Sequence, residues 1–115
     1  KNYSEKILIQ APLNKSHKKF GFEEPIKYFV PSIGISEVVP FNKKDTEFLV
    51  GAMGNEIVEE DLGLHYIMLD NERKKIIKHE YYPLNERVRD IAVNKNRDKI
   101  ILFLETTSSL AILIN

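Results

Sequence analysis

The feature that most constrains this chain is its series of short apolar runs, each closed by turn residues. The runs are about 3–7 residues long, are rich in Ile, Val, Phe and Tyr, and are bounded by Gly, Pro, Asn, Asp or Ser, which is typical of β-strands. They lie at Ile7–Ile9, Ile26–Val30, Phe48–Met53, Leu64–Leu69, Ile76–Tyr82, Val88–Val93, Ile100–Leu104 and Leu110–Ile114. The chain is therefore predicted to be all-β.

One segment offers a helical alternative. Asn55–Leu64 is polar enough for an amphipathic helix, but only Ile57, Val58, Leu62 and Leu64 would be buried, and Gly63 would end it. We therefore expect no helix in this segment.

Polar turns between the later runs predict an antiparallel meander. Asp70–Arg73 separates two β-rich runs, and Asn94–Lys99 and Glu105–Ser109 separate the last three. We predict in particular that Arg87–Ile114 forms three consecutive antiparallel strands. Strands at this spacing without helices between them are typical of a sandwich, a barrel or the blades of a propeller, and the pattern does not choose among them.

Length and proline content suggest how the chain is organised. With 115 residues and 13.4 kDa, it fits a single domain or a fragment of a larger one. Four of its five prolines, Pro12, Pro25, Pro31 and Pro40, lie in the first forty residues. We expect residues 1–40 to be a loop-rich arm and residues 41–115 to be the β-meander.

Composition excludes several classes of function. Seventeen Lys and Arg balance seventeen Asp and Glu, so the chain lacks the positive excess expected of a nucleic-acid partner or of a protein bound to an anionic membrane. The absence of cysteine excludes disulfides, thiolate metal sites and cysteine nucleophiles. Its longest apolar stretches are about a quarter of the roughly 20 residues that a membrane helix needs, so no membrane span is expected.

Collinear motifs over residues 20–105 resemble those of a known family. They read Gly21-Phe22-Glu23-Glu24-Pro25, Pro31-Ser32-Ile33, Phe48-Leu49-Val50-Gly51-Ala52-Met53, Glu86-Arg87-Val88-Arg89-Asp90-Ile91 and Lys99-Ile100-Ile101-Leu102-Phe103-Leu104-Glu105. In this order the chain resembles the C-terminal part of the glucose/sorbosone dehydrogenase family, which comprises soluble quinoprotein aldose sugar dehydrogenases. Each motif alone is weak, and their common order carries the resemblance.

The resemblance implies a fold, an activity and a location. Members of the family are six-bladed β-propellers that bind pyrroloquinoline quinone (PQQ), with calcium, and oxidise a sugar hydroxyl by hydride transfer to the quinone. This chain would be a partial propeller of about two blades. It would be periplasmic or secreted, with its export signal outside the sequence given. The catalytic histidine of the family lies in an earlier blade, so the chain would be inactive alone. Its partners would be the missing N-terminal blades, or a second copy through exposed strand edges.

Arg87 and Arg89 are the candidate cofactor-binding residues. Residues two apart in a strand share a face, so the two guanidinium groups would project together and form a fork for a planar carboxylate. By the resemblance, the matching arginines contact PQQ, which is a tricarboxylate. The alternative is that Arg87 and Arg89 form solvated salt bridges with Glu86 and Asp90, which would contribute little.

Departures from the family pattern favour a second reading. Gly54 stands where family members with the cofactor often place a lysine, so one cation for the quinone is missing. A non-catalytic, propeller-like structural or binding module is therefore the alternative function. A third possibility is a small independent β-sandwich whose motifs match by chance.

Metal sites have little support in the sequence. His17, His65 and His79 do not show the i, i+2 or i, i+4 spacing of paired ligands, and we expect surface or half-buried histidines that bind no metal. The acidic residues Glu56, Glu59, Glu60 and Asp61 lack the Asp-x-Asp-x-Asp-Gly pattern of a calcium loop, so a solvated loop is expected there.

Overall fold

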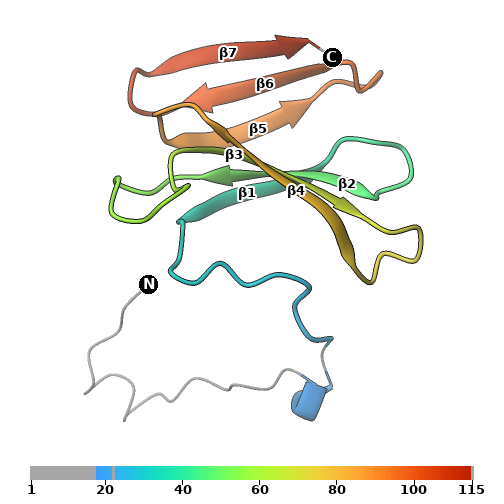
Figure 1. Ribbon diagram of the computed structural model, residues 1–115. Coiled ribbons are helices and arrows are strands. Elements are labelled where there is room, and N and C mark those ends of the chain that lie inside the picture. The colour runs from blue at the N-terminus through green and yellow to red at the C-terminus, as the bar shows by residue number, and fades with distance from the viewer. Residues whose placement is uncertain (1–17, 22, 115) are drawn as a thin grey trace.

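The computed structural model describes residues 18–21 and 23–114, which form strands and one short 3-10 helix (Figure 1). The elements are η1 Lys18–Phe20, β1 Ile35–Pro40, β2 Glu47–Ala52, β3 Gly63–Leu69, β4 Ile76–Pro83, β5 Val88–Val93, β6 Lys99–Leu104 and β7 Ser109–Ile114. They form two antiparallel sheets, one with the order β1-β2-β3-β4 and one with the order β5-β6-β7. The prediction of an all-β chain is confirmed.

Most predicted strands coincide with observed ones. Strands β2 to β7 occupy the predicted runs, and β5, β6 and β7 confirm the three consecutive antiparallel strands within Arg87–Ile114. Strand β1 was not predicted as a strand and lies inside the segment 1–40 that was expected to be a loop-rich arm. The predicted run Ile26–Val30 is not a strand, and 55–62 is a loop without a helix. The predicted run Ile7–Ile9 lies outside the described residues.

Three hairpins are closed by the same turn. Each begins with an Asn or Asp whose side-chain oxygen accepts hydrogen bonds from the N–H groups four and five positions further on, at 2.8–3.2 Å. The first residues are Asn42, Asp70 and Asn94, and the residues three positions later, Asp45, Arg73 and Arg97, have positive φ angles of 53°, 59° and 59°. These turns join β1 to β2, β3 to β4 and β5 to β6. The side-chain bonds replace the backbone ladder where the chain reverses.

The two sheets meet along β1 and β5. The Ser36 hydroxyl donates a hydrogen bond to the Val88 carbonyl at 2.5 Å, and the Ile91 N–H donates to the Glu37 carboxylate at 2.9 Å. Side chains of β1 thus satisfy backbone groups on the edge of β5 that β6 does not pair. Gly51 permits this approach, because a Cβ atom there would collide with the Ser36 hydroxyl and crowd Val88.

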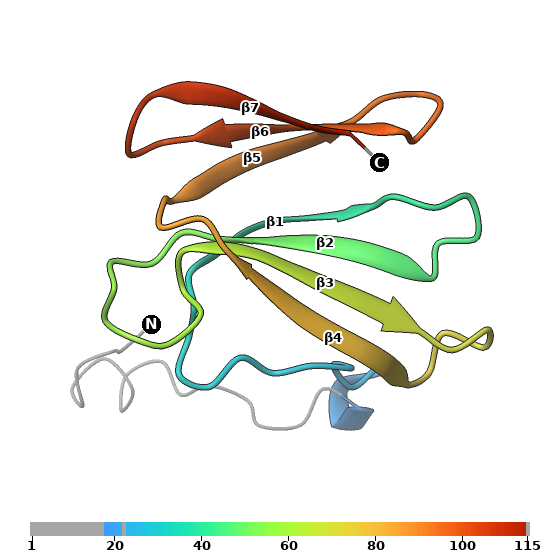
Figure 2. The same ribbon diagram turned by 45° about the horizontal axis from the view of Figure 1, so that its top comes forward.

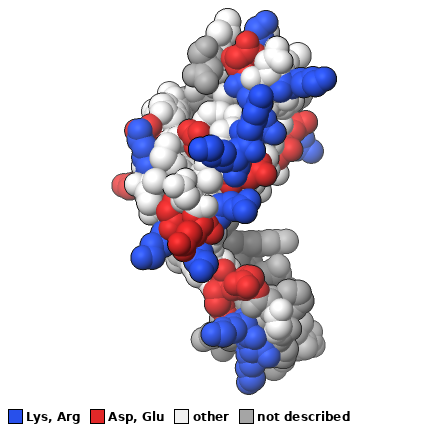
Figure 3. All heavy atoms as spheres, turned by 90° about the vertical axis from the view of Figure 1, so that its right-hand side faces the viewer, with Lys and Arg blue, Asp and Glu red and all other residues white. Residues whose placement is uncertain are grey.

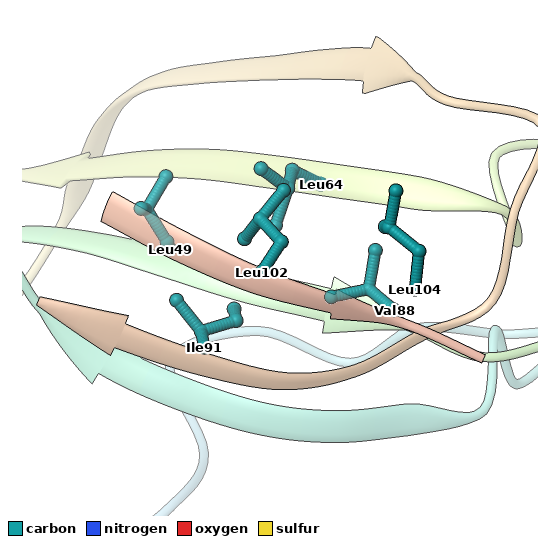
Figure 4. Close-up of a cluster of buried hydrophobic side chains, with 6 residues drawn as sticks. All are labelled: Leu49, Leu64, Val88, Ile91, Leu102 and Leu104. Carbon is teal, nitrogen blue, oxygen red and sulfur yellow. The ribbon is translucent and has the colours of Figure 1, made fainter. Parts of the chain in front are cut away.

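The main core lies between the sheets. Its buried side chains are Leu49, Leu64, Val88, Ile91, Leu102 and Leu104 (Figure 4). Leu49 and Leu64 come from the first sheet and the other four from the second. Burial of these groups is the main force that holds the sheets together.

The first sheet is also covered on its other face. Val50, Ile67 and Leu69 are buried there against Phe29, which belongs to the extended segment that precedes β1. Figure 2 shows this segment passing beneath β1–β4, whereas no described element lies beyond the far side of β5–β7. Among the described residues, the first sheet is therefore covered on two faces and the second sheet on one.

Candidate functional site

Arg87 and Arg89 converge on one carboxylate. The Arg87 Nε atom lies 2.9 Å from one oxygen of Glu105, and the Arg89 Nη1 atom lies 3.2 Å from the other. Arg87 directly precedes β5, and Arg89 is the extra residue of a β-bulge between Val88 and Asp90. Glu105 follows β6. The structure thus brings the two predicted site residues together, through a carboxylate that had not been expected as their partner.

Arg87 also joins the second sheet to the first. Its Nη1 atom donates to the carbonyl of Gly54 at 3.4 Å and to the side chain of Asn55, both in the loop between β2 and β3. Its side chain is 30% exposed, compared with 57% for Arg89. Besides Glu105, Arg89 contacts the Met53 sulfur, which lies 4.0 Å from its Nη1 atom. Arg87 is therefore a bridge between loops, whereas Arg89 keeps donors that face solvent.

The salt-bridge partners expected from the sequence make other contacts. The Glu86 carboxylate accepts hydrogen bonds from the Thr107 N–H and hydroxyl at 3.0 and 2.6 Å. Asp90 lies beside Glu37, and the hydrogen bond with Asp90 is the main cause that raises the pKa of Glu37 above its ordinary value. Within the described residues, neither Glu86 nor Asp90 forms an ion pair with the arginines; Glu105 does so instead.

Gly54 has no room for the lysine that the resemblance would place there. A Cβ atom on Gly54 would collide with the side chain of Asp61, and the Gly54 N–H donates to the Asp61 carbonyl at 2.8 Å. The Asp61 carboxylate is buried and accepts hydrogen bonds from the N–H groups of Ile57 and Val58 at 3.2 and 3.3 Å. Asp61 thus organises the acidic loop from inside.

Acidic residues do not assemble into a metal site. Glu56, Glu59 and Glu60 are exposed, and the described part of the chain contains no group of three or more His, Cys, Asp or Glu side chains able to hold a metal ion. The expectation of a solvated acidic loop holds for Glu56, Glu59 and Glu60 and was wrong for Asp61, which is buried.

His65 was expected to be a surface or half-buried residue, and that expectation was wrong. This side chain is fully buried, and its Nδ1 atom lies 2.8 Å from Nε2 of His79. The two residues are diagonal neighbours on adjacent strands, because His65 pairs with Tyr81 and His79 pairs with Ile67. The hairpin turn at Asp70 does not by itself predict this pair. A regular register from Leu69–Ile76 would pair His79 with Tyr66 and put the two imidazoles on opposite faces, and the register shift between Met68 and Leu69 brings them to the same face.

Hydrogen bonding defines the tautomers of this pair. The Nε2 atom of His65 lies 2.8 Å from the Glu60 carbonyl, which can only accept, so His65 carries its proton on Nε2. Its Nδ1 then accepts from the Nε2–H of His79. Burial lowers the pKa of His79, and the nearby His65 and Lys27 lower it further.

Two hollows flank the first sheet. One of about 470 Å³ is lined by the covering segment, including Lys27 and Phe29, and by His79 and the acidic loop. The other, of about 570 Å³, opens between the sheets and is lined mainly by apolar and aromatic side chains, among them Tyr66, Tyr82 and Leu113. Neither hollow includes Arg87 or Arg89 in its lining.

Surface charge is mixed. On the face shown in Figure 3, Lys and Arg side chains lie among Asp and Glu side chains, so that face has no extended region of one sign. Across the described residues, no helix is long and apolar enough to cross a membrane.

The fold and this site define an all-β chain of two antiparallel sheets with an internal arginine–carboxylate cluster. Comparison with protein-family models, with curated proteins and with solved structures finds no match for this chain.

Proposed function

We propose that this chain is a non-catalytic, blade-like β-module that serves as a structural or binding part of a larger assembly. Its topology supports this proposal. Strands β1–β4 follow one another in a four-stranded antiparallel meander, which is the form of one propeller blade. Strand β5 then begins a second meander and lies beside β1 and β2. That placement corresponds to the innermost strands of two adjacent blades.

The observation that carries the non-catalytic function is the closed arginine cluster. Arg87 donates to Glu105, to the Gly54 carbonyl and to Asn55, and these contacts tie the second sheet to a loop of the first. A guanidinium with partners on two loops acts as a structural link. A ligand carboxylate that took both arginines would have to displace Glu105, while the contacts of Arg87 with Gly54 and Asn55 hold its other donors in place.

A second candidate function is the one implied by the family resemblance, namely the C-terminal part of a PQQ-dependent sugar dehydrogenase. The observation in its favour is that Arg87 and Arg89 both bind one carboxylate, as a carboxylate fork requires. As folded, however, these residues do not fit PQQ. Arg87 is occupied, Gly54 excludes a lysine, and only Arg89 offers free donors. We therefore derive no catalytic step for this chain.

Titration with PQQ in the presence of calcium separates the two functions. The structural function predicts no absorbance change of the quinone. It also predicts that Arg87→Ala lowers the free energy of unfolding by about 1 kcal/mol, the scale of one net hydrogen bond, and that Arg89→Ala, at a more exposed site, lowers it less. Micromolar binding of PQQ that either substitution weakens tenfold or more would overturn the structural function in favour of the dehydrogenase.

A further inference from the structure

The outer face of the β5–β7 sheet carries a continuous apolar stripe. We define the outer stripe as Ile101, Phe103, Leu110, Ile112 and Ile114, from β6 and β7. Ile101 pairs with Ile112, and Phe103 pairs with Leu110. Directly paired residues share a face, so these four side chains form one block. Ile114 extends the block on β7, because it is two residues beyond Ile112.

This stripe is exposed to an unusual degree. The exposed fractions are 40% for Ile101, 38% for Phe103, 69% for Leu110, 62% for Ile112 and 77% for Ile114. The alternate residues of the same strands, such as Leu102 and Leu104, are buried in the core on the inner side. The β6 and β7 part of this sheet is thus largely apolar on both faces, but only the inner face is covered, and Figure 2 shows no described element beyond the outer one.

The size of the stripe suits a stable protein interface. At ~150 Å² for a whole large apolar side chain, the exposed fractions amount to on the order of 400 Å² of apolar surface, which is within the range of the largest, often functional, apolar patch of a monomer. A standard interface buries about 800 Å² per partner, of which somewhat more than half is apolar. The stripe therefore supplies about the apolar area that one side of such an interface requires.

We propose that a second copy of this chain packs its own outer stripe on this face, with two-fold symmetry. The reason is the asymmetry of the two sheets. The outer face of the first sheet is covered by the segment that carries Phe29 and Ile33. The outer stripe of one copy therefore cannot pack on the first sheet of another copy in a head-to-tail contact. Among the described residues, the stripe can meet an open sheet face only by meeting itself, which defines an isologous dimer.

Such a dimer would have the geometry of a β-sandwich. Two antiparallel sheets pack face to face about 10 Å apart, with the side chains of the two inner layers interdigitated. The five side chains of each stripe would form that middle layer. This inference goes beyond the proposed function and does not depend on it, because the oligomeric state and the binding of PQQ are measured separately.

Sedimentation velocity of the purified chain over a wide concentration series tests the proposal. We expect a reversible monomer–dimer equilibrium. Ile112→Lys places a charge in the centre of the stripe and should weaken the dimer at least tenfold. Ile77→Lys is the matched control, because Ile77 is also 62% exposed but lies on β4 in the other sheet, and it should leave the equilibrium unchanged.

Three results would overturn the proposal. One is a monomer at every concentration of the unsubstituted chain, and another is open-ended association in place of a discrete dimer. The third is an equal effect of Ile77→Lys and Ile112→Lys. Far-UV circular dichroism verifies that each variant folds, and Leu110→Lys, at a 69% exposed position of the same stripe, replaces Ile112→Lys if that variant does not fold.

Discussion

The two sheets contain similar strands in different surroundings. In β3 of the first sheet, five of the seven residues are buried, because one face packs on the core and the other on the segment before β1. In β6 of the second sheet, only Leu102 and Leu104 are buried, and exposed residues alternate with them. A strand covered on both faces loses the alternation of exposure that a strand covered on one face keeps.

This difference teaches that hydrophobicity alone does not report burial in this chain. Ile101 and Phe103 are as apolar as Leu102 and Leu104. The two pairs lie on opposite faces of β6, and only the face that carries Leu102 and Leu104 is covered. The surplus of apolar residues on the second sheet marks a surface that is available for another protein. The equivalent face of the first sheet is covered by the segment before β1, which carries Phe29.

The largest expected effect contrasts the two faces of β6. Leu102→Ala removes a fully buried side chain from the core and should lower the free energy of unfolding by about 2–5 kcal/mol, because it leaves a cavity. Ile101→Ala, on the outer face of the same strand, should cost less than about 1 kcal/mol at concentrations where the chain is monomeric. Urea unfolding followed by circular dichroism measures both. Equal losses would show that the outer face is as well packed as the inner one.

A smaller effect is expected at the cover of the first sheet. Phe29 is half-buried and packs its ring edge-on against His65, with 5.1 Å between ring centroids. Phe29→Ala should lower the free energy of unfolding by about 1–2 kcal/mol, less than the 3–5 kcal/mol of a fully buried Phe. Tyr28→Ala, at an exposed neighbour, is the control and should change it little. If Phe29→Ala has no effect, the segment does not close this face.

The smallest effect is a dependence of stability on pH. The pKa of His79 is lowered in the folded state, chiefly by burial, so between that lowered pKa and about 6.5 the unfolded chain binds more protons. The free energy of unfolding should therefore be highest above about pH 6.5 and should decrease as the pH falls through this window. His79→Gln should flatten the decrease when urea midpoints are measured between pH 5 and 8. A profile identical to that of the unsubstituted chain would contradict the role of His79.

The comparison between strands shows why most of the fold could be predicted. Runs of β-branched and aromatic residues between Asn, Asp and Ser turns coincide with β2 to β7. Strand β1 was missed because Ser36 and Glu37 interrupt its apolar pattern and Pro40 ends it. The side chains of Ser36 and Glu37 instead form hydrogen bonds with the edge of β5, between residues more than fifty positions apart in the sequence. No local pattern contains that information.

The candidate site was predictable only in part. Arg87 and Arg89 meet on a carboxylate of the chain itself, but not by the strand alternation that their two-residue spacing implied, because Arg87 precedes β5 and Arg89 is the extra residue of a bulge. Their partner could not be chosen, because Glu86 and Asp90 are near in sequence while Glu105 is brought near by the pairing of β5 with β6. The sequence thus drew attention to the two donors, and the bulge together with the pairing of β5 and β6 brought them to the acceptor.

By itself the sequence determined strands β2 to β7, the turns from Asp70 onward and the antiparallel order of these neighbours along the chain, because these depend on side-chain propensity and on contacts a few residues apart. The tertiary structure alone decided which apolar faces are covered, that β1 seals β5, and that His65 is buried beside His79. The physical reason is that burial is a property of what packs on a face. Two faces of equal hydrophobicity differ only when one of them meets a second layer.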